Sequence, residues 1–222
     1  MLGTQDLTLF IISGLLLNIA PGPDSLLIVT RSTQHGWRAG SAAALGIGAG
    51  TMVHIFAAAL GLSALLIASS TAFTVIKLMG AAYLLYAGCQ LLWQSRTQRG
   101  DCNKEAEVQI AVATENKVAI SNRRIFVQGF LTNLLNPKVA IFFLAFVPQF
   151  ISPETNNKAL AFIFLGCIFN FNGMLWCHFL ALSAEFASKR IRIPALLKAW
   201  LNRLIGALFI SFGFKLATSH AT

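Results

Sequence analysis

Two short segments place proline beside side chains that could do chemistry, within largely apolar sequence. They are Pro21-Gly22-Pro23-Asp24 and the segment that holds Asn133, Asn136, Pro137 and Lys138. Proline lacks a backbone N–H and clashes with the preceding helical turn, so each segment should interrupt a helix. The two interruptions would bring free backbone groups next to one carboxylate and one ammonium. Together these groups could bind a small molecule that carries both charges.

Asp24 and Lys138 need an explanation because a charge deep in an apolar helix is costly. An acidic residue there normally faces a helix-bundle interior or a water-filled cavity, which makes Asp24 a candidate binding residue. Alternatively, Asp24 could cap the half-helix that restarts after the prolines. Lys138 could instead snorkel to an interface, although it lies about 20 Å of helix away from Arg124.

His54 is a third candidate, and three glycines precede it. The imidazole lies in the centre of an apolar stretch, where it could relay protons or contact a ligand. A hydrogen bond to a neighbouring helix is the alternative. Gly46, Gly48 and Gly50 resemble a nucleotide-binding run only superficially, since no strand precedes them. We expect these glycines to allow close helix packing.

The elements that must position these residues are apolar helices. Of 222 residues, 56% are hydrophobic and 11% are charged, whereas roughly a quarter are charged in soluble domains. Uncharged stretches of 38, 26 and 18 residues follow Arg38, Lys158 and Lys77, and a transmembrane helix needs about 20 residues. The sequence therefore predicts an all-α integral membrane protein. The net charge of +9 fits membrane topology better than nucleic-acid binding, so we expect no nucleic-acid partner.

We expect six transmembrane helices in a single domain that covers residues 1–222. Their approximate ranges are 7–30, 39–68, 72–95, 125–150, 159–184 and 199–217. Arg31, His35 and Arg38 should form a short basic loop after the first helix. Residues 96–124 are hydrophilic, and we interpret them as a solvated cytoplasmic loop. Asn170 and Asn172 should make hydrogen bonds between helices, and lining a cavity is the alternative.

The two halves of the chain resemble each other. Gly14-Leu-Leu-Leu-Asn18 followed by Pro21 has a counterpart in Gly129-Phe-Leu-Thr-Asn133 followed by Pro137. Each half has an odd number of spans, so the second half would insert upside down relative to the first. We therefore expect two inverted three-helix repeats. In secondary transporters this arrangement places the site near the midplane, between broken helices.

The Lys and Arg residues are distributed unevenly, and cytoplasmic loops normally carry the excess. The connections after the first, third and fifth helices hold Arg31, Arg38, Arg96, Arg99, Lys104, Lys117, Arg123, Arg124, Lys189, Arg190, Arg192, Lys198 and Arg203. The opposite side holds Lys77, Lys158 and Lys215. Both termini should therefore face outward.

At these residues the chain resembles the LysE/RhtB family of bacterial amino-acid exporters. The resemblance rests on Pro21-Gly22-Pro23-Asp24, on Gly36-Trp-Arg-Ala-Gly40, on LGIGAG and on the segment from Gly129 to Lys138. It covers essentially the whole chain. The resemblance implies a multi-pass membrane transport domain of the bacterial inner membrane, a secondary active exporter that is driven by the proton gradient. Its cargo would be amino acids or related small metabolites.

We expect the two interruptions to bind the substrate and Asp24 to couple its export to protons. The substrate-binding residues would be Pro21, Gly22, Pro23, Asp24, Asn133, Asn136, Pro137 and Lys138. His54 is a second candidate for proton coupling. Because Asp24 is the only deep acidic residue in the expected helices, neutral amino acids are favoured over basic ones.

Two other functions stay open. A metal-cation exporter would need several carboxylates or thiolates within the membrane, and a membrane-embedded enzyme would need a nucleophile with its base. The four cysteines are irregularly spaced, which indicates free thiols and neither disulfides nor a metal site. The expected partners are an amino-acid substrate, protons and the lipid bilayer, without a cofactor or metal. The sequence leaves homo-oligomerisation open.

The basic-residue count predicts which loops are accessible from outside the cell. In a cysteine-free background, Ser70→Cys and Asn156→Cys should react with a membrane-impermeant thiol reagent added to intact cells. Asn116→Cys should react only after the membrane is permeabilised. Labelling of Asn116→Cys in intact cells would reverse the orientation.

Overall fold

The computed structural model describes residues 3–20, 22–68, 120–152 and 154–187, and single helical residues between 75 and 93 and between 200 and 218. The named helices are α1 (Leu7–Ile19), α2 (Pro23–His35), α3 (Trp37–Ala68), α6 (Asn122–Leu134), α7 (Pro137–Ile141) and α8 (Lys158–Ala187). After α7 the chain continues as a π-helical turn, η1 (Phe142–Phe146), and a 3₁₀ turn, η2 (Val147–Phe150). Pro21, Lys77, Cys102, Lys215 and the expected loop through residue 119 lie outside the described residues.

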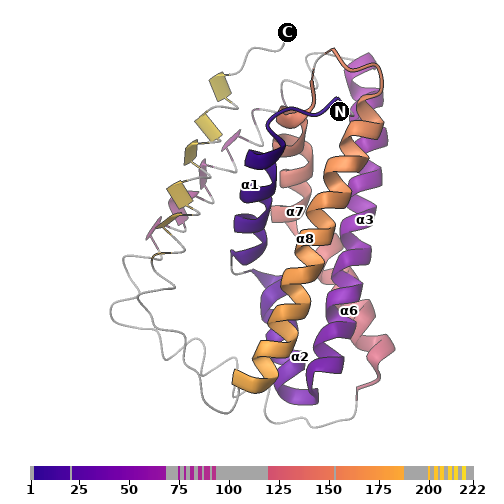
Figure 1. The fold of residues 1–222 in the computed structure, drawn as a ribbon, viewed down its shortest axis with the longest axis vertical. Helices are drawn as coiled ribbons and strands as arrows, with labels where there is room; N and C mark the ends of the chain where they lie inside the picture. The colour runs from indigo at the N-terminus through magenta and orange to yellow at the C-terminus, as the bar shows by residue number, and fades with distance from the viewer. Residues whose placement is uncertain are drawn as a thin grey trace.

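Two helix pairs are broken at the expected prolines. The chain bends by 54° between α1 and α2, and by 49° between α6 and the segment Pro137–Phe150. In Figure 1 α1 lies above α2 and α7 lies above α6, so both breaks fall in the middle of the bundle. Because α1 precedes α2 and α6 precedes α7, the two broken pairs run in opposite directions.

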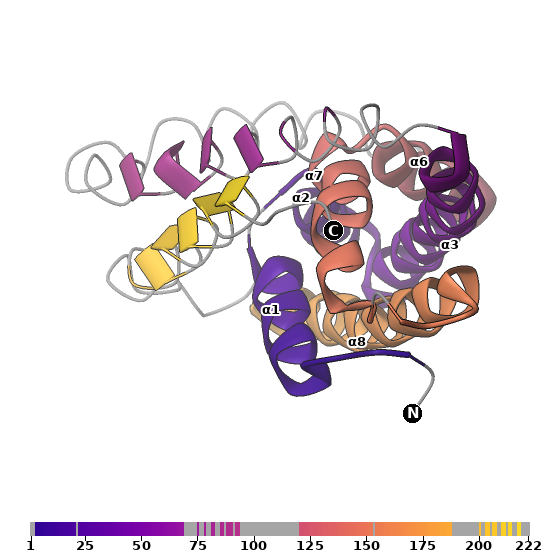
Figure 2. The same ribbon diagram turned by 90° about the horizontal axis from the view of Figure 1, so that it is seen from above.

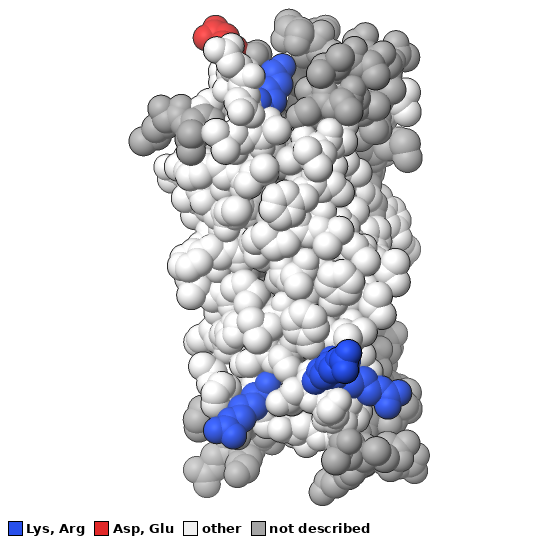
Figure 3. Space-filling view, turned by 90° about the vertical axis from the view of Figure 1, so that its right-hand side faces the viewer, with Lys and Arg blue, Asp and Glu red and all other residues white. Residues whose placement is uncertain are grey.

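The helices have the length and composition needed to cross a membrane. The ranges Trp37–Gly61 of α3 and Lys158–Ala184 of α8 are long and apolar enough to span it, and each bent pair qualifies if it counts as one span. Large apolar side chains such as Leu60, Phe171 and Phe179 are exposed. Figure 3 shows a broad uncharged band, with most of the visible Lys and Arg side chains gathered at one end of this face. These features are typical of a surface that faces lipid.

The structure corrects two expected boundaries. The predicted basic loop from Arg31 to Arg38 is instead helical, because α2 continues to His35 and α3 begins at Trp37. Gly36 alone separates the two helices, and its φ of 82° is one that glycine adopts without strain. The loop predicted to end at residue 124 ends earlier, since α6 begins at Asn122 behind its N-cap Ser121.

Glycines bring α3 close to both of its main neighbours. A Cβ atom added to Gly46 would clash with the backbone oxygen of Phe126, and one added to Gly129 would clash with that of Ala43. On another face of α3, a Cβ at Gly48 would lie 2.5 Å from the sulfur of Met174 on α8. The close packing predicted for the LGIGAG glycines is therefore confirmed.

Two buried clusters fill the bundle on either side of the breaks. The larger cluster is rich in phenylalanine and is formed by α1, α3, α8, the segment after Pro137 and Ala81. Its rings pack closely, with 4.5 Å between the centroids of Phe142 and Phe169. The smaller cluster is centred on Ile28, Ala43, Ile125 and Ala181. Its small side chains match the close approach of α3 to α6.

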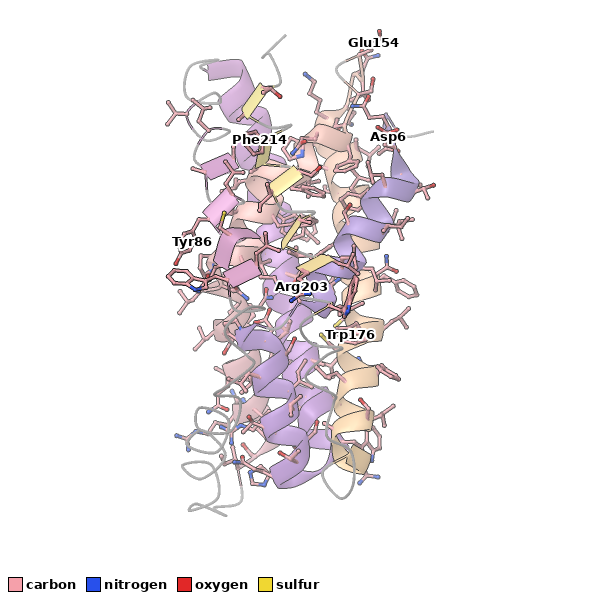
Figure 4. The ribbon with its side chains drawn as sticks, turned by 90° about the vertical axis from the view of Figure 1, so that its left-hand side faces the viewer. Asp6, Tyr86, Glu154, Trp176, Arg203 and Phe214 are labelled. Carbon is pink, nitrogen blue, oxygen red and sulfur yellow. The ribbon has the colours of Figure 1, made fainter. Side chains whose placement is uncertain are left out.

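The N-terminal segment is fixed to the turn that precedes α8. Thr4 and Ile151 form an antiparallel bridge, and Gln5 N donates to the Phe150 carbonyl at 2.9 Å. Figure 4 accordingly shows Asp6 and Glu154 at the same end of the molecule. These contacts hold the start of α1 against η2.

The helical residues near 75–93 and 200–218 lie side by side (Figures 1 and 2), and Ala81 packs into the larger buried cluster. A Cβ at Gly88 would lie 2.7 Å from the Gly206 carbonyl oxygen, and one at Gly206 would lie 2.9 Å from that of Gly88. Figure 4 places Arg203 in the middle part of the bundle and not at an end. Its assignment to the basic residues of a loop was therefore wrong.

Replacing a glycine at the contact between α3 and α6 should destabilise the protein. We expect Gly46→Ala or Gly129→Ala to lower the free energy of unfolding by about 1–3 kcal/mol, since the added methyl meets rigid backbone. Gly61→Ala is the matched control, because a Cβ at Gly61 has nothing within 4 Å. Thermal unfolding of the purified proteins in detergent measures the difference. Equal stability of all three variants would contradict this account of the packing.

Candidate functional site

The two breaks are built in the same way. Gly22 is the N-cap of α2 and Pro23 is its first residue; Asn136 is the N-cap of α7 and Pro137 is its first residue. Proline is favourable at this position, because its missing N–H would have no partner within the helix. The charged residues therefore occupy equivalent places, with Asp24 and Lys138 each second in its half-helix.

Asp24 is bound by the break of the other pair. Its Oδ2 atom accepts a hydrogen bond of 2.8 Å from Asn133 Nδ2 and one of 3.2 Å from Asn136 Nδ2. Its other carboxylate oxygen, Oδ1, has no hydrogen-bond partner among the described residues, so the alternative in which Asp24 caps its own half-helix was wrong. Its position in the first turn of α2 is still favourable, since the positive end of the helix dipole lies there.

Both asparagines are oriented by their second hydrogen bond. The Oδ1 atom of Asn136 accepts from the backbone N–H of Lys138 at 3.1 Å, which caps α7. The Oδ1 atom of Asn133 lies 3.2 Å from the hydroxyl of Thr51, which also lies 3.1 Å from the Ile47 carbonyl. Since the amide oxygens are used in this way, the amide nitrogens face Asp24. The carboxylate thus meets two neutral donors that the scaffold holds in place.

Lys138 reaches the opposite break. Its Nζ atom donates to the Ala20 carbonyl at 3.0 Å, and a Cβ at Gly22 would lie 3.6 Å from the same nitrogen. The ammonium therefore stays inside the bundle, and the snorkelling alternative was wrong. Asp24 and Lys138 thus make reciprocal bonds, each to the break in the other helix pair.

A cavity lies where the two breaks meet. Its volume is about 40 Å³. Its polar lining residues are Asn18, Asp24, Ser25, Thr51, Asn133, Asn136, Lys138 and Asn170. Two buried atoms, Asp24 Oδ1 and Asn18 Nδ2, have no hydrogen-bond partner among the described residues. The site thus contains one acceptor and one donor that a ligand could satisfy.

The structure brings together most of the predicted residues. Gly22, Asp24, Asn133, Asn136 and Lys138 line the cavity. Pro23 and Pro137 begin the two half-helices beside it.

His54 lies outside the lining of this cavity. Its Nε2 atom is 3.1 Å from the Asn133 carbonyl, which is the hydrogen bond between helices that was one of its two interpretations. Its ring stacks on Phe143 with 6.4 Å between centroids. His54 therefore contacts Asn133, beside the second break, from outside the cavity.

Several lining residues were not predicted as part of the site. Asn18 had a signal, because it corresponds to Asn133 in the internal repeat. For Thr51 on α3 and for the lining residues of α8, helical spacing was the one signal in the sequence that related them to the site. The α8 residues are Phe169, Gly173, Met174 and Cys177; Asn170 also lines the cavity, which was the alternative interpretation of that residue. Only the packing of α8 against α1 and α3 shows that this face borders the cavity.

The chain is similar to known proteins along nearly its whole length. A family model described as LysE type translocator matches residues 15–220, so the family resemblance inferred from the sequence is confirmed. An uncharacterized membrane protein of Pseudomonas aeruginosa is 32% identical over 218 residues, which are 98% of this chain and 97% of the relative.

Two further relatives carry a functional name. The leucine efflux protein of Salmonella typhimurium is 28% identical over 216 residues, or 97% of this chain and 96% of the relative. The leucine efflux protein of an Enterobacter species is 27% identical over 218 residues, or 98% of each chain. No solved structure matches this chain.

Proposed function

Since the chain belongs to the LysE type translocator family, we propose that it exports neutral amino acids from the bacterial cytoplasm across the inner membrane. The observation that carries this proposal is the cavity between the two breaks, which is lined by one carboxylate, one ammonium and apolar side chains. The names of the leucine efflux relatives support the same class of cargo.

The charged groups suit the two ends of an amino-acid zwitterion. The substrate ammonium would bind Asp24 Oδ1, the carboxylate oxygen that is buried without a partner among the described residues. The substrate carboxylate would bind the Lys138 ammonium, which has three N–H donors and gives one to Ala20. Asn18 Nδ2 supplies a further donor. Charge-assisted hydrogen bonds of this kind are stronger than neutral ones.

The rest of the lining favours a neutral side chain. Leu17, Ile47, Val139, Phe169 and Met174 give the cavity apolar walls. In the part of the chain that the structure describes, Asp24 is the one carboxylate of the lining. A second cation on the substrate would therefore lie in this cavity without an anionic partner, which is costly.

Proton coupling would act through the same carboxylate. When deprotonated, Asp24 attracts the substrate ammonium; when protonated from outside, it no longer does, and the substrate is released. A proton that binds in the outward-facing state and leaves in the inward-facing state would thereby drive export. Asn133 and Asn136 can hydrogen-bond to Asp24 in both forms, because a protonated carboxyl group still accepts.

The proposed architecture has two inverted halves with both termini outside. The opposed directions of the two broken pairs support inversion, and so does the equivalent placement of Asp24 and Lys138. Exposed Arg38, Arg123 and Arg124 lie where α3 and α6 begin, at the end that we place in the cytoplasm.

Because Asp24 is the one carboxylate among the described lining residues, we expect the protein to prefer neutral over basic amino acids. In inverted membrane vesicles, which take up what the cell exports, leucine, threonine or homoserine should be transported at least about tenfold better than lysine or arginine. Tenfold corresponds to about 1.4 kcal/mol, and an unpaired buried charge costs more than that. Equal transport of lysine and leucine would refute the preference for neutral substrates.

The two charged residues should have different roles in transport. Asp24→Asn should abolish proton-driven export, because the amide cannot exchange a proton, and should leave counterflow only at raised substrate concentration, because a neutral side chain binds the substrate ammonium weakly. The amide oxygen can still accept from Asn133 and Asn136, so we expect the variant to fold. Lys138→Met should weaken substrate binding and impair both processes. Lys138→Gln retains a donor for the Ala20 carbonyl, so it separates loss of charge from loss of structure. Export and counterflow are measured in the same vesicles.

Matched controls use the same substitutions at exposed sites. Asp6→Asn and Lys158→Met should transport like the wild type, since both side chains lie at the surface. Full proton-driven export by well-expressed Asp24→Asn would exclude its coupling role. If either single variant failed to fold and removal of both charges restored folding, the two residues would be a structural pair instead.

A further inference from the structure

Met174 packs against Gly48 in the wall of the cavity. It lies on α8, and its sulfur approaches α3 at Gly48, where an added Cβ would be 2.5 Å away. Gly48 and Met174 both line the cavity. Any larger residue at position 48 would therefore have to displace the Met174 side chain.

The cavity is too small for an amino acid in this conformation. Its volume of about 40 Å³ compares with roughly 300–1,000 Å³ for small-molecule pockets. Some part of the wall must move before a substrate can bind. Three residues of the lining around Asp24 are fixed by hydrogen bonds, namely Asn133, Asn136 and Lys138. The apolar side chains of the lining have no such bonds to hold them.

Met174 is the apolar lining side chain best suited to move. Methionine is unbranched and has three rotatable side-chain bonds, so it adapts its shape at low cost. By contrast, Phe169 packs against the rings of Phe142 and Phe143, with centroid distances of 4.5 and 5.4 Å. Ile47 and Val139 belong to the buried clusters on either side and are branched at Cβ.

We propose that Met174, which packs against Gly48, limits the size of the substrate side chain that the cavity accepts. The α3 and α8 wall would receive the side chain of the substrate, while Asp24 and Lys138 bind its charged groups. This inference rests on the proposed function, because it assigns specificity within the same site. It makes Met174 and Gly48 residues that determine specificity.

Opposite changes at these two positions should shift the preference in opposite directions. Met174→Ala removes the movable side chain, so phenylalanine transport should rise at least about tenfold relative to leucine transport. In Gly48→Ala the added methyl group would displace the Met174 side chain from its contact with α3. We expect the displaced side chain to narrow the cavity. Leucine transport should then fall about tenfold relative to alanine transport. In the double variant the leucine-to-alanine ratio should return toward the wild-type value.

The measurement is uptake of the three amino acids into inverted vesicles that contain the full chain. A ratio of two substrates in one preparation cancels the amount of folded protein, so partial misfolding does not mimic the effect. The matched controls are Gly61→Ala, where a Cβ meets nothing within 4 Å, and Leu175→Ala, whose side chain is 59% exposed. Both should keep the wild-type ratios.

The outcomes separate this inference from the proposed function. If the wild type transports neutral amino acids but Met174→Ala and Gly48→Ala keep its substrate ratios, the specificity role of Met174 is refuted. Equal loss for all substrates would likewise show that Met174 is only structural. If the wild type transports no neutral amino acid, the proposed function fails, and this inference fails with it.

Discussion

The arrangement of the bundle depends on the hydrogen bonds that cross between its two broken helices. A break leaves backbone and side-chain polar groups without helical partners, and in a membrane water cannot replace them. Here each break supplies the partner for the other: Lys138 reaches the Ala20 carbonyl, and Asp24 accepts from Asn133 and Asn136. Neither break is satisfied in this way unless the two helix pairs lie side by side, so the same bonds hold the bundle together and form the cavity.

The surrounding helices hold this pair of breaks in register. On α3, Thr51 and His54 both contact Asn133, through its side chain and its carbonyl respectively. The glycines of α3 allow α6 to approach closely enough for these contacts, since even a methyl group at Gly46 would meet the backbone of Phe126. Close packing at the glycines is therefore a condition for the polar geometry at the site.

The sequence predicted the parts of the structure that have a local cause. Proline next to a charge in an apolar run marks both breaks, and the glycine spacing of LGIGAG marks a packing face. The helix boundary at Gly36 was missed because basic residues on both sides suggested a loop, although one glycine with positive φ completes the turn. Asn18 was missed although it corresponds to Asn133 in the internal repeat. Thr51 and Met174 were missed because their role depends on which faces of separate helices meet. No property of a single helix reveals that pairing.

The two bends divide the bundle into an upper and a lower tier in the view of Figure 1. Above the breaks, the bridge from Thr4 to Ile151 joins α1 to the end of η2. Below them, Arg31 on α2 donates to Gln128 on α6 at 2.9 Å. Each tier is thus tied within itself, and the tiers meet at the two bends and along the continuous helices α3 and α8. A change of angle at one bend would break the bonds that reach the other bend, so the two bends must flex together.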